Sequence, residues 1–265
     1  MLFALILSAL AGLATSIGGW MSTHRRVRER GVLAVGLGFA AGAMIFVSFA
    51  EMIPLGIDAM NEAGSDYAIW LVYGAFFVGM ALVALIDRVL PHGFNPSHVE
   101  GRENELSSAD KKENRRLMRS GLMIAVVLAL HNFPEGMSTF FATYQDISVG
   151  IALAIAIAIH NIPEGIAVAA PVYAATKNRK KAIRWATLSG LAEPLGAAVA
   201  ILLISFVIPS KLFGLIFGLV AGMMVFLSLD ELLPASQRYA NRSHHVVYSV
   251  GAGMLAVALS VVLVT

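Results

Sequence analysis

The sequence has no cysteine and few charged residues, and each shortage excludes a class of protein. Because none of the 265 residues is cysteine, disulfide frameworks, thiolate metal sites and cysteine nucleophiles are all excluded. Asp, Glu, Lys and Arg make up 14% of the chain, against roughly 25% in an ordinary soluble domain. That is too little charge to cover a soluble surface. The net charge of +2 also gives no electrostatic support for nucleic-acid binding.

Hydrophobic residues make up 58% of the chain and form runs of about 20 residues, long enough to cross a bilayer as helices. The apolar stretches between charge clusters predict eight spans, at 2–20, 33–54, 68–88, 120–143, 148–174, 185–208, 212–234 and 246–264. No basic residue precedes the first run, so we expect it to stay in the lipid bilayer as a helix. The sequence thus predicts an all-α membrane protein, a single domain over residues 1–265 with a charged loop at 89–119.

Lysine and arginine predict the orientation of the chain. All but one of the 19 Lys and Arg residues lie in or beside the odd-numbered connections between spans, and the exception is Lys211. The second connection instead carries Asp58, Glu62 and Asp66. The positive-inside rule therefore puts the odd-numbered connections, including loop 89–119, in the cytoplasm and both termini outside. A bacterial inner membrane is the expected location.

Two pairs of segments resemble each other. Residues 40–54 and 220–234 match at seven of fifteen positions, including a glutamate and a proline. The second pair is HNFPEG at 131–136, in the fourth span, and HNIPEG at 160–165, in the fifth. The charge map makes the members of each pair antiparallel. We therefore expect eight transmembrane helices in an inverted 3+2+3 repeat, an architecture of secondary transporters.

Each six-residue motif combines a histidine and a glutamate on one helix face with an asparagine and a proline. Pro134 and Pro163 have no N–H, so we expect each helix to kink and expose a carbonyl near the middle of its span. The polar residues of both motifs, together with a glutamate of the sixth span, are the candidate metal ligands: His131, Asn132, Glu135, His160, Asn161, Glu164 and Glu193.

Three of these candidates are glutamates, each costing about 2.5–3.5 kcal/mol at a helix centre. No lysine or arginine lies at mid-membrane to neutralise them, which leaves protons or metal cations. Histidine, carboxylate and amide ligands without sulfur suit Zn, Fe, Mn, Co and Cd. Two such antiparallel helices with Glu193 supply two adjacent metal positions, bridged by Glu135 and Glu164. The alternative for one motif alone is a buried His–Glu hydrogen bond that locks a kinked helix.

Other polar residues lie towards the membrane surfaces. Glu51, near the outer end of the second span, and Asp230 and Glu231, near the inner end of the seventh, are candidates for admitting and releasing a cation. Carboxylates at such positions also serve as helix caps. Four cytoplasmic histidines are either acceptors of released metal or ordinary solvated residues: His92, His98, His244 and His245.

The two motifs make the sequence similar to the ZIP (Zrt-, Irt-like) metal transporter family. The resemblance covers essentially the whole chain, and HNFPEG followed by HNIPEG at this separation is highly specific. It implies uptake of divalent metal into the cytoplasm through a binuclear centre, often in a homodimer. One position would use Glu135, His160 and Glu164, with His131 close by. The other would use Asn132, Glu135, Asn161, Glu164 and Glu193.

The predicted function is transport of zinc and also of iron, manganese, cobalt and cadmium, with the transported ion as ligand and no separate cofactor. The rival class is an intramembrane metalloenzyme. It lacks support because neither the His-Glu-x-x-His helix of zinc proteases nor the Glu-x-x-His pairing of di-iron bundles occurs. A metal sensor would need an effector domain outside the membrane, and the longest loop, 89–119, is too short for one.

Overall fold

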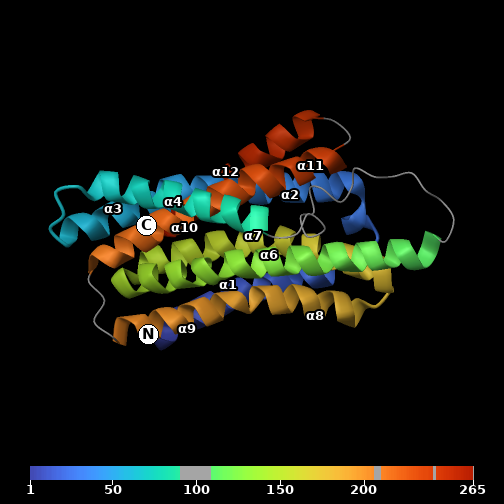
Figure 1. Ribbon diagram of the computed structural model, residues 1–265, viewed down its shortest axis with the longest axis horizontal. Coiled ribbons are helices and arrows are strands. Elements are labelled where there is room, and N and C mark those ends of the chain that lie inside the picture. The colour runs from blue at the N-terminus through green and yellow to red at the C-terminus, as the bar shows by residue number, and fades with distance from the viewer. Residues whose placement is uncertain (90–108, 206–209, 241–242, 265) are drawn as a thin grey trace.

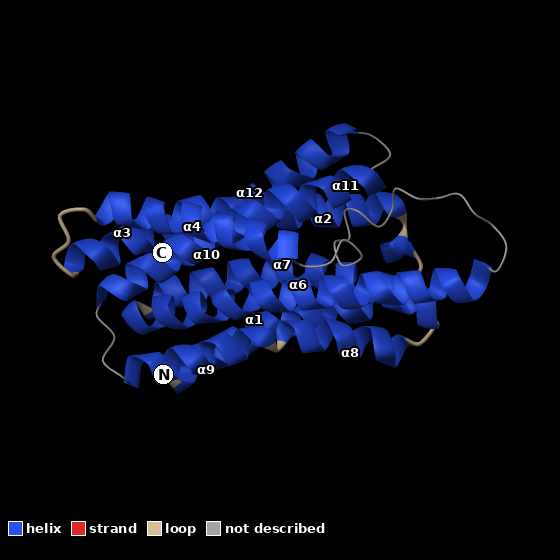
Figure 2. Cartoon of the chain, in the orientation of Figure 1, coloured by secondary structure: helices blue, strands red, loops and turns tan. Residues whose placement is uncertain are grey.

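The computed structural model describes residues 1–89, 109–205, 210–240 and 243–264, and within them helix is the only regular secondary structure (Figure 2). The α-helices are α1 (Leu2–Met21), α2 (Arg30–Val47), α3 (Ile53–Glu62), α4 (Ala68–Val89), α6 (Ala109–Gln145), α7 (Ile147–Thr176), α8 (Arg179–Gly190), α9 (Ala192–Ser205), α10 (Ser210–Leu227), α11 (Leu233–Tyr239) and α12 (Ser243–Val264). Three short helices connect them: the 3-10 helix η1 (Arg26–Arg28) and the π-helices η2 (Ser48–Met52) and η3 (Ser228–Leu232). The all-α prediction is confirmed.

Seven helical segments are long and apolar enough to cross a membrane: Leu2–Met21, Arg30–Glu62, Ala68–Leu85, Ile147–Thr176, Arg179–Ile204, Lys211–Tyr239 and His244–Val262. They correspond to seven of the eight predicted spans. The remaining one, 120–143, lies inside α6, which is helical over 37 residues. The long helices run side by side, and the start of α1 lies at the same end of the molecule as the end of α12 (Figure 1). The chain is a multi-pass membrane protein.

Two boundaries differ from the sequence prediction. Helix α6 begins at Ala109, so residues 109–119 of the expected charged loop are helical, whereas 90–108 lie outside the described residues. The expected span 185–208 consists of α8 and α9, which meet at Leu191. Pro194 explains this division, because it has no N–H to donate to the carbonyl of Gly190.

The prolines of the two motifs do not interrupt their helices. Helices α6 and α7 continue through Pro134 and Pro163. Each proline removes a single backbone hydrogen bond, the one that the carbonyl of Leu130 or Ile159 would accept. The helical geometry changes in other segments of the chain.

The change of geometry comes at the two π-helices. Ile53 donates its N–H to the carbonyl of Ser48, five residues back, and Pro54 follows it. In η3 the N–H of Leu233 bonds to Ser228 in the same way. Because proline cannot make the bond to the residue four positions back, the wider turn ends where the proline begins. Both π-helices occupy the same place in the repeated segments 40–54 and 220–234.

The helices pack in two bundles. The site bundle consists of α1, α6, α7, α8 and α9, and the support bundle of α2, η2, α3, α4, α10, η3, α11 and α12. In the support bundle α2 packs against α12 and α10 against α4. The bundles meet where α2 and α12 contact α7 and where α10 contacts α6.

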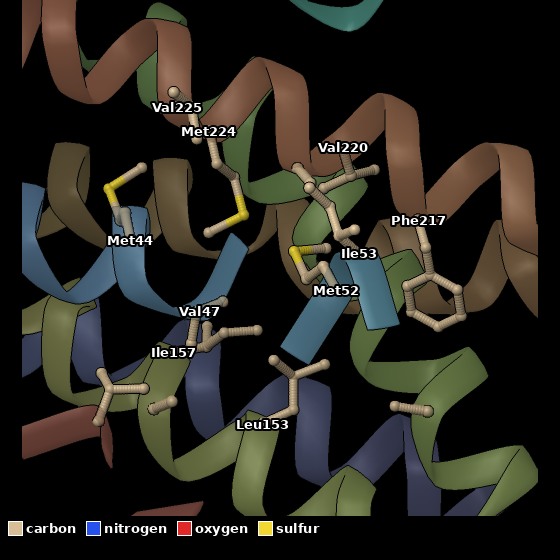
Figure 3. Packing of buried hydrophobic residues seen from close by; sticks show 14 of the residues in the cluster. Met44, Val47, Met52, Ile53, Leu153, Ile157, Phe217, Val220, Met224 and Val225 are labelled. Atoms are coloured by element: carbon tan, nitrogen blue, oxygen red, sulfur yellow. The ribbon is translucent and has the colours of Figure 1, made fainter. Parts of the chain in front are cut away.

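A hydrophobic cluster fills the space between the two bundles (Figure 3). Met52 and Ile53 lie between Phe217 of α10 and the side of α7 that carries Leu153 and Ile157. All five side chains are at most 2% exposed. The support bundle thus packs an apolar wall against α7, the helix that carries the second motif.

Candidate metal centre

Helices α6 and α7 form an antiparallel hairpin with its turn at Asp146. The carboxylate of Asp146 accepts hydrogen bonds from the N–H groups of Ser148 (2.7 Å) and Val149 (3.3 Å) and from the Ser148 hydroxyl. These bonds stabilise the charged form and lower the pKa of Asp146. They also cap the first turn of α7. The hairpin places the two motifs on neighbouring antiparallel helices.

The polar side chains of both motifs are fully buried, and so is the glutamate at the start of α9. The residues that are 0% exposed are Asn132, Glu135, His160, Asn161, Glu164 and Glu193. The carboxylate of Glu193 interacts electrostatically with those of Glu135 and Glu164. The fold therefore brings the three predicted acids together in one solvent-free region. The seventh candidate, His131, lies on α6, but its side chain is outside the described part of the structure.

A hydrogen bond joins the two motifs. Nε2 of His160, on α7, lies 3.1 Å from Oε1 of Glu135, on α6. This contact connects the histidine of one motif to the glutamate of the other. It differs from the alternative considered for a single motif, a bond within one helix.

The two asparagines hold their amides in a fixed orientation. Asn161 donates from Nδ2 to the carbonyl of Ala11, at 2.9 Å, and to Oε1 of Glu193. Asn132 donates from Nδ2 to the carbonyl of Ser189, at 3.4 Å. A carbonyl oxygen can only accept, so the nitrogen of each amide must face it and Oδ1 must point elsewhere.

Several buried oxygen atoms beside these bonds receive no hydrogen bond from the described residues. They include Oδ1 of Asn132, Oδ1 of Asn161 and Oε2 of Glu193. Buried oxygens without a donor are costly, and a divalent cation is one kind of ligand that can compensate this cost. No three His, Asp or Glu side chains of the described residues are close enough together to hold an ion by themselves. In this arrangement a cation would need the amide oxygens as well as carboxylates.

Helix α1 is the part of the centre that sequence reasoning missed. It packs against α7, α8, α6 and α9, and its Ala11 carbonyl holds the amide of Asn161. The available signal is a row of small residues, Gly12, Thr15 and Gly18, of the kind that lets membrane helices approach closely. A Cβ at Gly18 would overlap the carbonyl oxygen of Ile162.

The acids expected at the two mouths lie in the π-helices. Glu51 is in η2, Asp230 and Glu231 are in η3, and all three are partly buried. The prediction put these acids near the ends of their spans. The helical segments continue beyond them to Glu62 and Tyr239, so the acids lie inside long helical segments. Of the four cytoplasmic histidines, His244 and His245 are exposed at the start of α12, and His92 and His98 lie outside the described residues.

Comparison with known proteins identifies the group to which this arrangement belongs. The sequence model of the family described as ZIP zinc transporter matches residues 1–261. The chain belongs to the ZIP family. The resemblance noted from the two motifs is thereby confirmed.

Curated ZIP relatives match this chain over nearly their whole lengths. The zinc transporter ZupT of Streptococcus mutans is 46% identical over 261 residues, which cover 98% of this chain and 97% of that protein. ZupT of Oceanobacillus iheyensis is 46% identical over 264 residues (99% and 98%). ZupT of Xanthomonas axonopodis is 47% identical over 266 residues (98% and 94%). The family is one of transporters and not of enzymes.

Proposed function

We propose that this ZIP protein carries Zn²⁺ into the cytoplasm and accepts Fe²⁺, Mn²⁺, Co²⁺ and Cd²⁺ at the same site. The observation that carries the proposal is the group of buried oxygens without donors on Asn132, Asn161 and Glu193, next to the bonded pair of Glu135 and His160. This set contains nitrogen and oxygen but no sulfur, which suits borderline and hard divalent ions. The names of the relatives support zinc as the main cargo.

The ions would occupy two adjacent positions bridged by Glu135 and Glu164. The first position would use these two glutamates and His160, with His131 close by. Because no three of the described His, Asp and Glu side chains lie close enough together to hold an ion, these side chains would move towards the ion when it binds. The second would add Asn132, Asn161 and Glu193. The carboxyl group of Glu193 is near enough to those of the two bridging glutamates for their charges to repel one another, and this proximity supports a shared centre. Binding has to be moderate, because a closed cage of strong ligands would retain the ion.

The fold of this centre is an inverted 3+2+3 repeat. Its support is that equivalent segments make equivalent contacts: α2 packs on α12 as α10 packs on α4, and α1 packs on α7 as α9 packs on α6. Equivalent serines begin the two π-helices, and Ser48 and Ser228 each donate a 2.8 Å bond to the carbonyl four residues earlier. A pseudo-two-fold axis through the centre gives an ion similar surroundings on both sides.

The ion would enter from outside past Glu51 and leave past Glu231 after a conformational change. Exposed basic residues, including Arg25, Arg26 and Lys180, support a cytoplasmic location for the end opposite the termini. The termini would then lie outside the bacterial inner membrane. A homodimer, implied by the family resemblance, stays a prediction that the mass of the protein in detergent would test.

The decisive experiment replaces Glu164 with alanine. We expect Glu164→Ala to abolish Zn²⁺ uptake into proteoliposomes, because the ion loses a bridging carboxylate, while the protein stays in the membrane. The matched control is Glu62→Ala, which removes an exposed glutamate at the end of α3 and should leave uptake unchanged. Normal uptake by Glu164→Ala would refute the proposed function. Metal-dependent turnover by the wild-type protein without flux would favour the enzyme alternative.

A further inference from the structure

Helices α1 and α9 occupy equivalent places around the α6–α7 hairpin. A Cβ at Gly165 of α7 would overlap the carbonyl oxygen of Thr15, and a Cβ at Gly136 of α6 would overlap that of Glu193. The two glycines occupy the same position in the two six-residue motifs. Thr15 of α1 therefore stands against α7 as Glu193 of α9 stands against α6.

The crossing of α1 with the α8–α9 segment gives the same correspondence. A Cβ at Gly12 would overlap the carbonyl oxygen of Gly190, and a Cβ at Gly190 would overlap that of Gly12. The same Cβ at Gly12 would lie 3.3 Å from Cβ of Glu193, and the Cβ at Gly190 would lie 3.0 Å from Cβ of Thr15. Gly12 of α1 thus faces Glu193 as Gly190 faces Thr15 of α1.

The asparagine amides follow the same rule. Asn161 donates to the carbonyl of Ala11, four residues before Thr15, and Asn132 donates to the carbonyl of Ser189, four residues before Glu193. Thr15 is thus related to Asn132 as Glu193 is related to Asn161. Glu193 accepts a bond from Asn161, which places Thr15 on the Asn132 side of the centre.

The hydroxyl of Thr15 differs from most hydroxyls in these helices. Ser48, Thr143 and Thr176 each donate to the carbonyl four residues earlier. Thr15 is 0% exposed, and its Oγ1 has no hydrogen-bond partner among the described residues. The Ala11 carbonyl, which would be its acceptor, is bonded to Asn161.

The oxygens without donors consequently include two equivalent pairs. One pair is Oδ1 of Asn161 with Oε2 of Glu193, and the other is Oδ1 of Asn132 with Oγ1 of Thr15. The first pair carries a carboxylate, and the second is neutral. We propose that Thr15 is a further ion ligand, whose hydroxyl and Asn132 form the neutral side of the second position, opposite the charged side formed by Glu193 and Asn161.

This inference rests on the proposed transport function and refines it. A neutral hydroxyl and an amide oxygen bind a divalent ion more weakly than a carboxylate does. An ion at Thr15 is therefore held briefly, which favours passage along the path. The difference between Thr15 and Glu193 also distinguishes the two sides of an otherwise symmetric centre.

The first test measures Zn²⁺ uptake into proteoliposomes as a function of Zn²⁺ concentration. Thr15→Val keeps the shape and removes the ligand oxygen, so the concentration at half-maximal rate should rise about threefold to tenfold. Thr15→Ser restores the oxygen and should return the value close to that of the wild type. Ser8→Ala is the matched control, because Ser8 is another fully buried α1 hydroxyl without a partner among the described residues. The counterpart of Ser8 in the α8–α9 segment is Ala186, which has no polar side-chain atom, so Ser8 does not belong to an equivalent pair of ligands.

Equal half-maximal concentrations for Thr15→Val, Ser8→Ala and the wild type would overturn the inference. So would an equal rise in Ser8→Ala, because the effect would then not be specific to Thr15. Absence of flux in the wild-type protein would instead overturn the proposed function, so the two failures are distinguishable.

A swap of the two counterparts is the second test, and it remains informative if Thr15→Val does not reach the membrane. Glu193→Thr should lose most uptake, and the double variant Thr15→Glu with Glu193→Thr should recover a measurable part by moving the carboxylate to the other side. Uptake in the double variant no higher than in Glu193→Thr would contradict the equivalence of the two positions.

Discussion

The two bundles bury polar groups in different ways. Every buried polar residue of the support bundle, within the described part of the chain, is a serine that donates to a backbone carbonyl: Ser48, Ser228, Ser236, Ser249 and Ser260. The site bundle instead buries three glutamates, a histidine and two asparagines. Several of its oxygens have no donor among the described residues.

This difference indicates which bundle has a structural role and which one has the functional site. A serine bonded to a backbone carbonyl of its own helix, or of a neighbouring helix as at Ser236, satisfies its hydroxyl at little cost and needs no ligand. Buried carboxylates and open amide oxygens destabilise a protein unless something compensates them. The support bundle is therefore complete as an apolar protein interior, whereas the site bundle keeps buried oxygens that the proposed cation would satisfy.

The largest expected effect comes from neutralising an acid of the site bundle. Glu135→Gln keeps an oxygen that can accept the bond from His160 but removes the charge, so Zn²⁺ uptake should fall by at least about 100-fold. Because the buried carboxylates repel one another, removing one charge while keeping the bond to His160 should leave stability in metal-free detergent unchanged or raised. Uptake assays and thermal unfolding of the same preparation would measure both. A large fall in stability would show that Glu135 is structural.

The next largest effect is a loss of stability, expected from a substitution that disrupts the packing of the support bundle. Met224 is 0% exposed in the central cluster, and Met224→Ala would leave a cavity. In soluble cores such a change costs about 2–5 kcal/mol; we expect about 2 kcal/mol here, because lost van der Waals contacts are the main term between membrane helices. Unfolding measurements should show this loss, and Zn²⁺ affinity should stay near that of the wild type. A change in affinity without loss of stability would argue against the division into two bundles.

A smaller effect compares two buried serines. Ser236 donates a 2.6 Å bond from α11 to the Ala34 carbonyl of α2, so Ser236→Ala should cost about 1 kcal/mol of stability. Ser8 has no such bond among the described residues, and Ser8→Ala should cost nothing measurable. The two variants should be unfolded side by side in the same detergent. Equal losses of stability in the two variants would show that the hydrogen bond of Ser236 does not contribute measurably.

The sequence predicted which polar side chains are buried together better than it predicted the helices that surround them. The spacing of the two HN-x-PEG motifs placed the histidine and the glutamate of each on one helix face, and Glu193 followed from the cost of an acid in mid-membrane. The structure brings these side chains together as buried groups. Such residues can be found because their burial is hard to explain without a ligand.

Other features could not be read from the chain because they depend on packing between distant segments. A proline predicts only a lost hydrogen bond, and the neighbouring helices decide whether the result is an uninterrupted helix, as at Pro134, or a π-helix, as before Pro54. Likewise the small residues Gly12, Thr15 and Gly18 indicate only that α1 packs closely against another helix, and not that it borders the centre. That role comes from the close crossing of Gly12 and Gly190.

The central claim is that acids from α6, α7 and α9 share a bound cation. X-ray absorption at the zinc edge of the purified, zinc-loaded protein would test it most directly. The account predicts only nitrogen and oxygen ligands, at about 2.0–2.2 Å, and loss of this bound zinc when Glu135 and Glu164 are both replaced by glutamine. Zinc retained in unchanged coordination by that double variant would contradict the account.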